Sequence, residues 1–313
     1  MTDFQLTTPV AFLIFNRPDT TARVFEAIRQ AKPPKLLVVA DGPRPDRPDD
    51  IEKCKAARAV IEGVDWDCEV LTNYSEVNLG CGKRPVTGIT WVFEQVEEAI
   101  ILEDDILPDT TFFQFCEILL DKYRNDQRVM MISGENWLGQ WKSNIQSYHF
   151  SCYGDMWGWA SWRRAWQYFD YDMKLWIESE ARERIRNVLA SDEQFKVREK
   201  IFWQAYREKD VIQCWDYQWS FARLLYSGLS IVPSLNLVLN IGFGKESTHC
   251  FDASSMGYSD RRHYEMAFPL KEPYGLAVDR EYDQLYFESA MKPSKNYLKR
   301  IINKLRKNIT RPV

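Results

Sequence analysis

The chain of 313 residues is 45% hydrophobic and 27% charged, and its net charge is −4. This is ordinary globular composition, which excludes a disordered or collagen-like chain. No run of about 18 apolar residues occurs, so no transmembrane helix is expected. The N-terminus lacks a basic region followed by an apolar core, so no secretory signal is expected either. The residues before Ser289 contain more Asp and Glu than Lys and Arg, and this net negative charge argues against a nucleic-acid-binding protein.

The seven cysteines are odd in number and scattered, and they form no Cys-x-x-Cys pair. This pattern argues against a disulfide framework and against a thiolate zinc site, and it favours a reducing cytoplasm. Only three histidines are present. Any metal is therefore expected to be held mainly by carboxylates, which favours hard ions such as Mg²⁺ or Mn²⁺.

The first third of the chain alternates short apolar runs with amphipathic stretches. Strand–helix alternation of this kind predicts right-handed crossovers and an α/β fold, with a mostly parallel sheet and helices on both faces. The expected strands cover 9–15, 36–40, 68–72 and 99–102, and the expected helices cover 19–30, 50–61 and 86–95, with a turn at 78–82.

The second part of the chain shows no internal repeat and no linker that would separate independent domains. One domain is therefore expected over residues 1–288, followed by a separate tail over 289–313. The expected helices cover 109–123, 178–208 and 216–226, the expected strands cover 129–132, 229–232 and 235–240, and the tryptophan-rich stretch 137–176 is expected to be mixed.

The turn after the first expected strand, Asn16-Arg17-Pro18, contains no glycine. Dinucleotide and P-loop sites need glycines at this point so that backbone N–H groups reach the phosphates. NAD-dependent enzymes and Walker-type nucleotidases are therefore disfavoured. The glycine-rich start of sugar nucleotidyltransferases is missing as well.

Three consecutive carboxylates, Glu103, Asp104 and Asp105, follow the buried strand 99–102. Ligands bind at the carboxyl ends of parallel strands, and a divalent ion that bridges a carboxylate to a diphosphate would offset the clustered negative charge. The alternative is a solvated strand end at which one Asp caps the next turn. Because Asp109 already serves as the cap of the following helix, the metal interpretation is favoured.

Further polar side chains follow the first two strands or the turn at 78–82. Asp41 is a candidate to accept a hydrogen bond from a uracil or ribose, or it is only a residue of the Asp-Gly-Pro turn. Arg17 and Arg84 are candidates to contact the base or the phosphates, or they are structural.

Asp216, flanked by aromatic residues, is a candidate general base, or the N-cap of the helix that follows it.

Two other segments are candidates to form the site. The polar loop with Lys245, Ser247, Thr248 and His249 is expected to fold over a diphosphate, with His249 near the metal, although a lone histidine is more often structural. Seven tryptophans lie between 137 and 176, and most are expected to pack in the core. Gly158-Trp159 is singled out as a candidate wall of a sugar pocket.

In chain order these motifs resemble glycosyltransferases of the GT-A fold, closest to the group typified by N-acetylglucosaminyltransferase I and to bacterial glycosyltransferase-like proteins of polysaccharide clusters. The resemblance covers about residues 9–260, and the acidic triplet is its most specific part. The matching segments are Asn16-Arg17-Pro18, Asp41-Gly42, Glu103-Asp104-Asp105, Gly158-Trp159, Trp215-Asp216 and the loop from Gly244 to His249.

The resemblance implies a GT-A (Rossmann-like) fold with a nucleotide-sugar-binding half, about 9–133, and an acceptor half, about 134–288. It implies Mn²⁺ (or Mg²⁺) held by Asp105, with Asp104 towards the ribose and Glu103 near the donor sugar. It also implies that Asp41 recognises uracil, so the donor is expected to be a UDP-sugar. The family's base lies in a Trp-Asp-Asp-Trp segment, whereas this chain has Trp-Asp-Tyr-Gln-Trp at 215–219.

The expected function is metal-dependent, inverting transfer of a sugar to a glycan or lipid-linked saccharide in surface polysaccharide assembly, with Asp216 as the base. The alternatives are a retaining transferase, a metal-dependent nucleotidyltransferase, and a non-catalytic carbohydrate-binding or scaffold protein on the same fold. Release of pyrophosphate from a nucleoside triphosphate would identify a nucleotidyltransferase. Donor hydrolysis that depends on Mn²⁺ would separate an enzyme from a scaffold protein.

The tail from Ser289 carries eight Lys or Arg residues and no Asp or Glu. Apolar residues recur there at helical spacing from Tyr297 to Ile309, with basic residues between them. This pattern predicts an interfacial helix on an anionic membrane surface, so the protein is expected in the cytoplasm, peripheral to the inner face of the cell membrane. The alternative is a solvated helix or a disordered basic tail.

Overall fold

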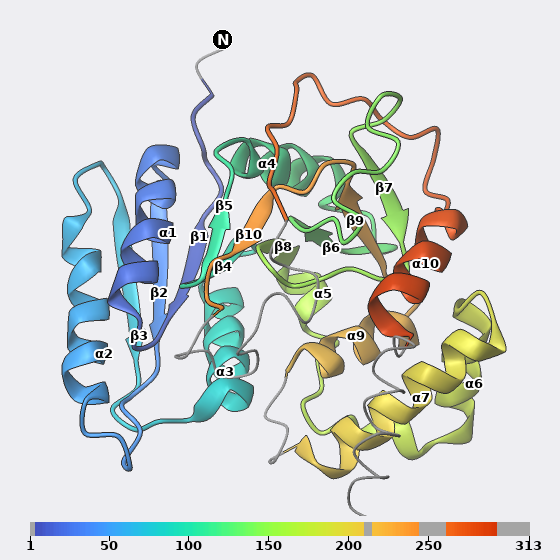
Figure 1. The fold of residues 1–313 in the computed structure, drawn as a ribbon, viewed down its shortest axis with the longest axis horizontal. Helices are drawn as coiled ribbons and strands as arrows, with labels where there is room; N and C mark the ends of the chain where they lie inside the picture. The colour runs from blue at the N-terminus through green and yellow to red at the C-terminus, as the bar shows by residue number, and fades with distance from the viewer. Residues whose placement is uncertain (1–3, 210–214, 244–260, 293–313) are drawn as a thin grey trace, which may run out of the picture.

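The computed structural model describes residues 4–209, 215–243 and 261–292. Most of its strands belong to one sheet, whose members are β1 (Val10–Ile14), β2 (Lys35–Ala40), β3 (Glu69–Tyr74), β4 (Glu98–Glu103), β6 (Val129–Ser133), β7 (Tyr148–Ser151), β8 (Trp159–Trp162) and β9 (Leu229–Pro233). Their spatial order is β3-β2-β1-β4-β8-β6-β9-β7 (Figure 1). Within the described ranges six of these strands run in one direction, and β8 and β7 run in the other. The predicted α/β class with a mostly parallel central sheet is confirmed.

Helices cover both faces of the sheet because its central strands are apolar on both sides. On β1, Phe12 belongs to an apolar cluster shared with α1 (Pro18–Ala31) and α4 (Thr111–Tyr123). The next residue, Leu13, points to the opposite face, as the alternation of side chains along a strand requires. There it packs in a second cluster with α3 (Gly80–Gln95) and α9 (Asp216–Leu225).

The remaining helices extend this sandwich at its two ends (Figure 1). Beside α1, at the β3 end, lies α2 (Asp50–Ala59), which continues into the 3₁₀ turn η1 (Val60–Gly63). At the other end a third apolar cluster forms around buried Trp176. Its helices are α6 (Ser179–Val188), α7 (Asp192–Arg207) and α10 (Arg280–Tyr286), and the short elements α5 (Arg163–Trp166), η2 (Lys174–Ile177) and η4 (Phe287–Met291) complete the described chain.

Two predicted elements differ from the structure for identifiable reasons. The predicted turn at 78–82 is instead the start of α3, because the carboxylate of Asp41, on another segment, accepts the N–H groups of Leu79 and Gly80 at 2.9 and 3.0 Å. The predicted helix 178–208 is two helices, because the side chain of Ser191 caps α7 by accepting the N–H of Gln194 at 3.2 Å.

A small second sheet brings the segment after β10 next to the acidic triplet. In it β10 (Val238–Asn240), which falls within the predicted strand 235–240, pairs antiparallel with β5 (Ile106–Pro108). Since β5 directly follows the acidic triplet at the end of β4, this pairing places residues 240–243 beside the triplet. Among the described helices, none is both long and apolar enough to cross a membrane. The tail over 293–313 lies outside the described residues.

Candidate active site

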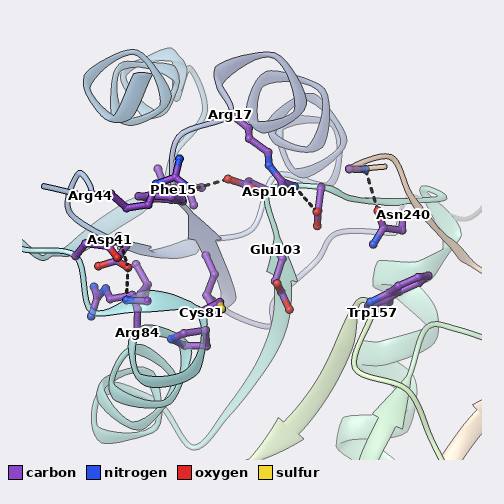
Figure 2. Close-up of a pocket in the computed structure, with 18 of the residues that line it drawn as sticks. Phe15, Arg17, Asp41, Arg44, Cys81, Arg84, Glu103, Asp104, Trp157 and Asn240 are labelled. Atoms are coloured by element: carbon purple, nitrogen blue, oxygen red, sulfur yellow. Dashed lines mark hydrogen bonds and ion pairs between the residues drawn. The ribbon is translucent and has the colours of Figure 1, made fainter. Parts of the chain in front are cut away.

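The sheet changes its order of connection between β1 and β4. From β1 the chain passes outward to β2 and β3, and it then returns to β4 on the other side of β1. The carboxyl ends of the strands at such a switch point diverge and leave a crevice for ligands. A cavity of about 340 Å³ lies here (Figure 2). It is lined by residues that follow β1, β2 and β4, by the start of α3, and by Trp157, Asn240, Gly242 and Phe243.

Two contacts of the acidic triplet join the ends of β1 and β4 (Figure 2). The backbone N–H of Phe15 donates to Asp104 Oδ2 at 2.9 Å. Arg17 Nη1 forms an ion pair with Asp105 Oδ2 at 2.6 Å. Glu103 lines the cavity beside them. Phe15 and Arg17, which follow β1, therefore both contact the acidic triplet at the end of β4.

The electrostatics of the triplet favour a bound cation. Burial, followed by the charges of Asp105 and Asp104, raises the pKa of Glu103 to about 8. Burial and the charge of Asp105 raise the pKa of Asp104 to about 7, and burial also raises that of Asp105. Among the described residues, Arg17 is the arginine whose charge lowers the pKa of all three carboxylates against burial, so a further positive charge would stabilise their ionised forms.

The donor set of the triplet fits a hard divalent cation such as Mn²⁺ or Mg²⁺, whose preferred ligands are carboxylate oxygens. Within residues 4–209, 215–243 and 261–292, no three acidic, histidine or cysteine side chains are already grouped as metal ligands. Asp105 is the described residue of the triplet that would hold such an ion.

Asp41 and Arg84 line the cavity from the β2 side and also hold its wall together. Asp41 Oδ1 accepts the N–H groups of Gly42 and Leu79, and Oδ2 accepts those of Gly80 and the Asn78 side chain, all at 2.9 to 3.0 Å. A uracil would have to replace one of these donors. Arg84 donates to the carbonyl of Ala40 at 3.1 Å, which anchors α3 to β2.

Asn16 does not line the cavity but supports a residue that does. It is buried, and its Nδ2 donates to Asp50 Oδ1 at 2.7 Å. Asp50 in turn pairs with Arg44 at 2.6 Å, and the Arg44 guanidinium lies 5.5 Å from the ring centre of Phe15. Arg44 and Phe15 both line the cavity and were not predicted. Arg44 belongs to the proline-rich loop after β2, whereas Phe15 is the last residue of the first expected strand.

The prediction for Gly158-Trp159 is wrong for the tryptophan, and the reason is local. Trp159 is 1% exposed, and its ring packs 5.8 to 6.1 Å from those of Trp166, Trp215 and Trp219 in the core. Trp157 lines the cavity instead. Between them Gly158 has φ +56°, and a Cβ there would approach Val238 to 2.8 Å, so the sharp turn requires glycine.

Asp216 is the first residue of α9, on the same face of the sheet as α3. It is not among the residues that line the cavity, but its charge raises the pKa of both Glu103 and Cys81, which do line it. This places the Asp216 carboxylate within electrostatic reach of the cavity. Its role as a base stays a prediction.

The segment after β10 closes the cavity on the side of Asp105. The N–H of Ile241 donates to the Asp105 carbonyl at 2.8 Å. A Cβ on Gly242 would lie 2.1 Å from Asp105 Oδ2 and 2.7 Å from Arg17 Nη1, so only glycine leaves room for the ion pair. Phe243 lines the cavity with its ring 6.0 Å from that of Trp157. The predicted site residues Lys245, Ser247, Thr248 and His249 lie outside the described residues.

No family model and no curated protein matches the chain. Among solved structures, mouse xyloside xylosyltransferase 1 in its apo form matches at 12% identity and a TM-score of 0.27, covering 42% of this chain and 53% of that one. UDP-glucose pyrophosphorylase complexed with UDP-glucose matches at 12% identity and a TM-score of 0.26, covering 47% and 63%. The chain thus spans less than two thirds of either protein. The likeness concerns the fold alone, at a low score, so the chemistry must be argued from the cavity.

Proposed function

We propose that the chain is a nucleotide-sugar-dependent glycosyltransferase of the GT-A type. The observation that carries this proposal is the position of the acidic triplet, which faces a cavity at the switch point between β1 and β4. A nucleoside diphosphate there would bring the negative charge that a bound cation bridges to carboxylates. Three arginines, Arg17, Arg44 and Arg84, line the same cavity and supply further positive charge for the phosphates.

The proposed donor is a UDP-sugar. Phe15, directly after β1, lines the cavity with an apolar ring on which a base can pack. Asp41 is the proposed hydrogen-bond partner of the uracil. As the resemblance to GT-A glycosyltransferases implies, Asp104 is assigned to the ribose and Glu103 to the donor sugar. Lys245, Ser247, Thr248 and His249 are proposed to cover the diphosphate, with His249 as a further metal ligand.

The proposed reaction inverts the configuration at the anomeric carbon. Mn²⁺ or Mg²⁺ on Asp105 supplies positive charge to the leaving diphosphate when it is bound. Asp216 takes the proton of an acceptor hydroxyl, whose oxygen forms the new bond to C1 while the bond from C1 to the diphosphate oxygen breaks. Arg17 remains beside the phosphates as a fixed positive charge, since its position is held through Asp105.

The alternatives differ in what they require of the cavity. A nucleotidyltransferase would use backbone N–H groups of a glycine-rich turn after β1, and this chain has Phe15-Asn16-Arg17-Pro18 there. A retaining transferase and a non-catalytic saccharide-binding protein would use the same donor cavity without Asp216 as a base. The distinction therefore depends on the stereochemistry of the product and on turnover.

The site of action is proposed to be the inner face of the cell membrane, where the basic tail from Ser289 would meet anionic lipid and the acceptor would be a glycan or a lipid-linked saccharide. The division into a single catalytic domain over 1–288 and this tail is part of the same proposal. Co-sedimentation of the full chain with anionic liposomes at low and high salt tests it. A chain shortened to end at Ser289 serves as the comparison. If the full chain also stays in the supernatant at low salt, as the shortened chain does, membrane attachment is contradicted.

The experiment that tests the function is a thermal-shift screen of nucleotide sugars with and without Mn²⁺. The expected result is a rise in melting temperature with a UDP-sugar that requires the metal, because a ligand that binds only the folded state stabilises it. Equal shifts with and without Mn²⁺, or no shift with any nucleotide, would contradict the proposal. A shift with a nucleoside triphosphate, together with pyrophosphate release, would favour the nucleotidyltransferase.

A further inference from the structure

A second charged cluster lies at the same edge of the sheet, on the far side of β8. Glu135 follows β6, and Asp155 follows β7 and precedes Trp157. The hydroxyl of Ser133 lies 3.2 Å from the carbonyl oxygen of Glu135 and 2.8 Å from that of Asp155, which holds the two segments together. Only β8 separates β6 from β4, so the ends of these two strands lie about 10 Å apart, which is two strand spacings.

Three arginines surround these two carboxylates. Arg261 Nη1 pairs with Glu135 Oε1 at 2.5 Å. Arg223 is 1% exposed and donates to the Ser230 hydroxyl and, at 3.3 Å, to the carbonyl of Gly154. The third, Arg198 on α7, lowers the pKa of Asp155 against the effect of burial, which places its guanidinium near that carboxylate.

Arg198 is the exceptional member of the cluster. It is 8% exposed, and it forms no hydrogen bond or ion pair with any residue in the described ranges. Its only described contact is with the ring of Tyr153, whose centre lies 5.0 Å from the guanidinium carbon. The Nε of Arg198 is buried and has no hydrogen-bond partner in the described part of the chain, which is costly, so a ligand that supplies an acceptor here would stabilise this arginine.

The charges of the cluster do not balance. In the described part of the chain three guanidinium groups face two carboxylates, which leaves one positive charge in excess. Burial raises the pKa of both Glu135 and Asp155, so neutralising either one increases the excess. The missing partner is therefore an anion.

Aromatic rings complete the surroundings of this cluster. Tyr286 donates its hydroxyl to Asp155 at 2.6 Å and stacks on Tyr153 with ring centres 4.9 Å apart. Trp137 packs edge-on against Tyr286, and Arg261 lies 4.0 Å from the centre of the Trp137 ring. Trp137, Asp155 and Arg261 are only partly buried, so the cluster opens to the surface. Tyr153 and Tyr286 are buried, so the partly exposed Trp137 is the ring of the three on which the apolar face of a sugar could pack beside the carboxylates.

We propose that this cluster is an acceptor subsite for an acidic sugar, whose carboxylate pairs with Arg198; as an acceptor site it rests on the proposed transferase function. A single carboxylate matches the single excess positive charge, whereas a phosphate monoester carries more charge than the cluster can balance. The end of β6, which Glu135 follows, lies about two strand spacings from the end of β4, so the acceptor would extend from this subsite towards the donor cavity.

The test uses the full chain and free monosaccharides as probes. Saturation-transfer NMR is recorded with glucuronic acid, with glucose and with glucose 1-phosphate, and UDP–Mn²⁺ binding is measured in parallel by calorimetry. The variants are Arg198→Met, of similar volume, and Lys196→Gln, which removes an exposed positive charge from the same helix. We expect a glucuronic acid signal that glucose does not reproduce, reduced about tenfold or more in Arg198→Met and unchanged in Lys196→Gln.

Stability separates a ligand-binding role from a structural one. Because Arg198 forms no hydrogen bond with residues 4–209, 215–243 or 261–292, Arg198→Met is expected to melt at or above the temperature of the parent chain. A fall of more than about 4 °C would show that Arg198 is structural and would overturn the proposal.

The remaining outcomes are also decisive. A glucuronic acid signal that is absent, or equal in parent and Arg198→Met, while UDP–Mn²⁺ binds normally, overturns the subsite and leaves the transferase proposal in place. An equal, Arg198-dependent signal from glucose 1-phosphate overturns the assignment to a carboxylate. An Arg198-dependent glucuronic acid signal without any UDP binding supports the subsite and contradicts the transferase proposal.

Discussion

Arg17 Nη1 lies 2.6 Å from Asp105 Oδ2, and this ion pair joins the turn after β1 to the end of β4. Both side chains are 18% exposed, so the pair borders the cavity rather than the bulk solvent. The arginine neutralises part of the acidic triplet and leaves Glu103 facing the cavity. A cation or a diphosphate that enters here meets charges whose positions the two strands already fix.

Gly242→Ala should weaken the binding of UDP–Mn²⁺. Its Cβ would fall 2.1 Å from Asp105 Oδ2, so the ion pair or the backbone must shift, and forced overpacking of this kind costs about 1–3 kcal/mol. Calorimetry of UDP binding and thermal unfolding measure the two effects. Gly275→Ala is the matched control, since no atom lies within 4 Å of its added Cβ. Equal behaviour of the two variants would show that Gly242 does not shape the cavity.

Trp157→Ala and Trp159→Ala should separate binding from stability. Trp157 lines the cavity, so its loss should weaken ligand binding with little change in unfolding. Trp159 is 1% exposed among other tryptophans, and its loss should cost about 3–5 kcal/mol of unfolding free energy. Urea unfolding and nucleotide-sugar binding of both variants provide the measurements. The reverse pattern would restore Trp159 as the ligand-binding residue.

His149→Phe should make the protein less sensitive to acid. His149 on β7 is 2% exposed and lies 4.2 Å from the ring of Tyr282, and burial lowers its pKa to about 3 although the Asp279 charge opposes the shift. The unfolded chain therefore binds one more proton than the folded chain between about pH 6.5 and 3, so stability falls as the pH falls through this window.

The size of this effect follows from the shift in pKa. At pH 5 the parent chain should lose about 2 kcal/mol relative to neutral pH through His149, a loss that His149→Phe avoids. Urea denaturation of both proteins at pH 7.5 and pH 5 measures the difference between them. Parallel losses in parent and variant would mean that His149 is not buried in its neutral form.

The local patterns of the chain predict β1, β2, β3, β4, β6 and β9, because these strands are short apolar runs. They do not predict β7 and β8, which lie within the stretch 137–176 that is expected only to be mixed. The acidic triplet, too, is placed by a local pattern, at the end of a buried strand. The start of α3 is not predictable in this way, because its N–H groups are satisfied by Asp41 from a different strand. Ser191 and Gln194 do form a local capping pattern, and it could have divided the helix predicted over 178–208.

The rest of the site depends on contacts between segments far apart in the chain. Arg44 reaches the cavity because Asp50 and Asn16 hold it, and the exchange of Trp159 for Trp157 follows from the left-handed backbone at Gly158. The cluster around Arg198 combines residues that follow β6 and β7 with α7, α9 and α10. No spacing in the sequence joins these residues, so only the fold shows that they meet.

Asp216→Asn should retain donor binding and lose about 10²–10⁴-fold in transfer, which is the usual contribution of a general base. Rates of donor turnover, with UDP affinity measured alongside, distinguish the two effects. Asp192→Asn is a matched control, because Asp192 is also the first residue of a helix and is exposed. Near-normal transfer by Asp216→Asn would place the base elsewhere or favour a retaining reaction.

The most direct test of the transferase proposal is calorimetry of UDP binding to the parent chain and to Asp105→Asn, each with and without Mn²⁺. Asp67→Asn, an exposed position away from the cavity, controls for the loss of one carboxylate. We predict that the parent and Asp67→Asn bind UDP only with Mn²⁺, and that Asp105→Asn loses about tenfold or more in affinity while its melting temperature shows that it remains folded. Equal UDP affinity in Asp105→Asn and the parent would contradict the transferase proposal, and so would a parent chain that binds UDP equally well with and without Mn²⁺.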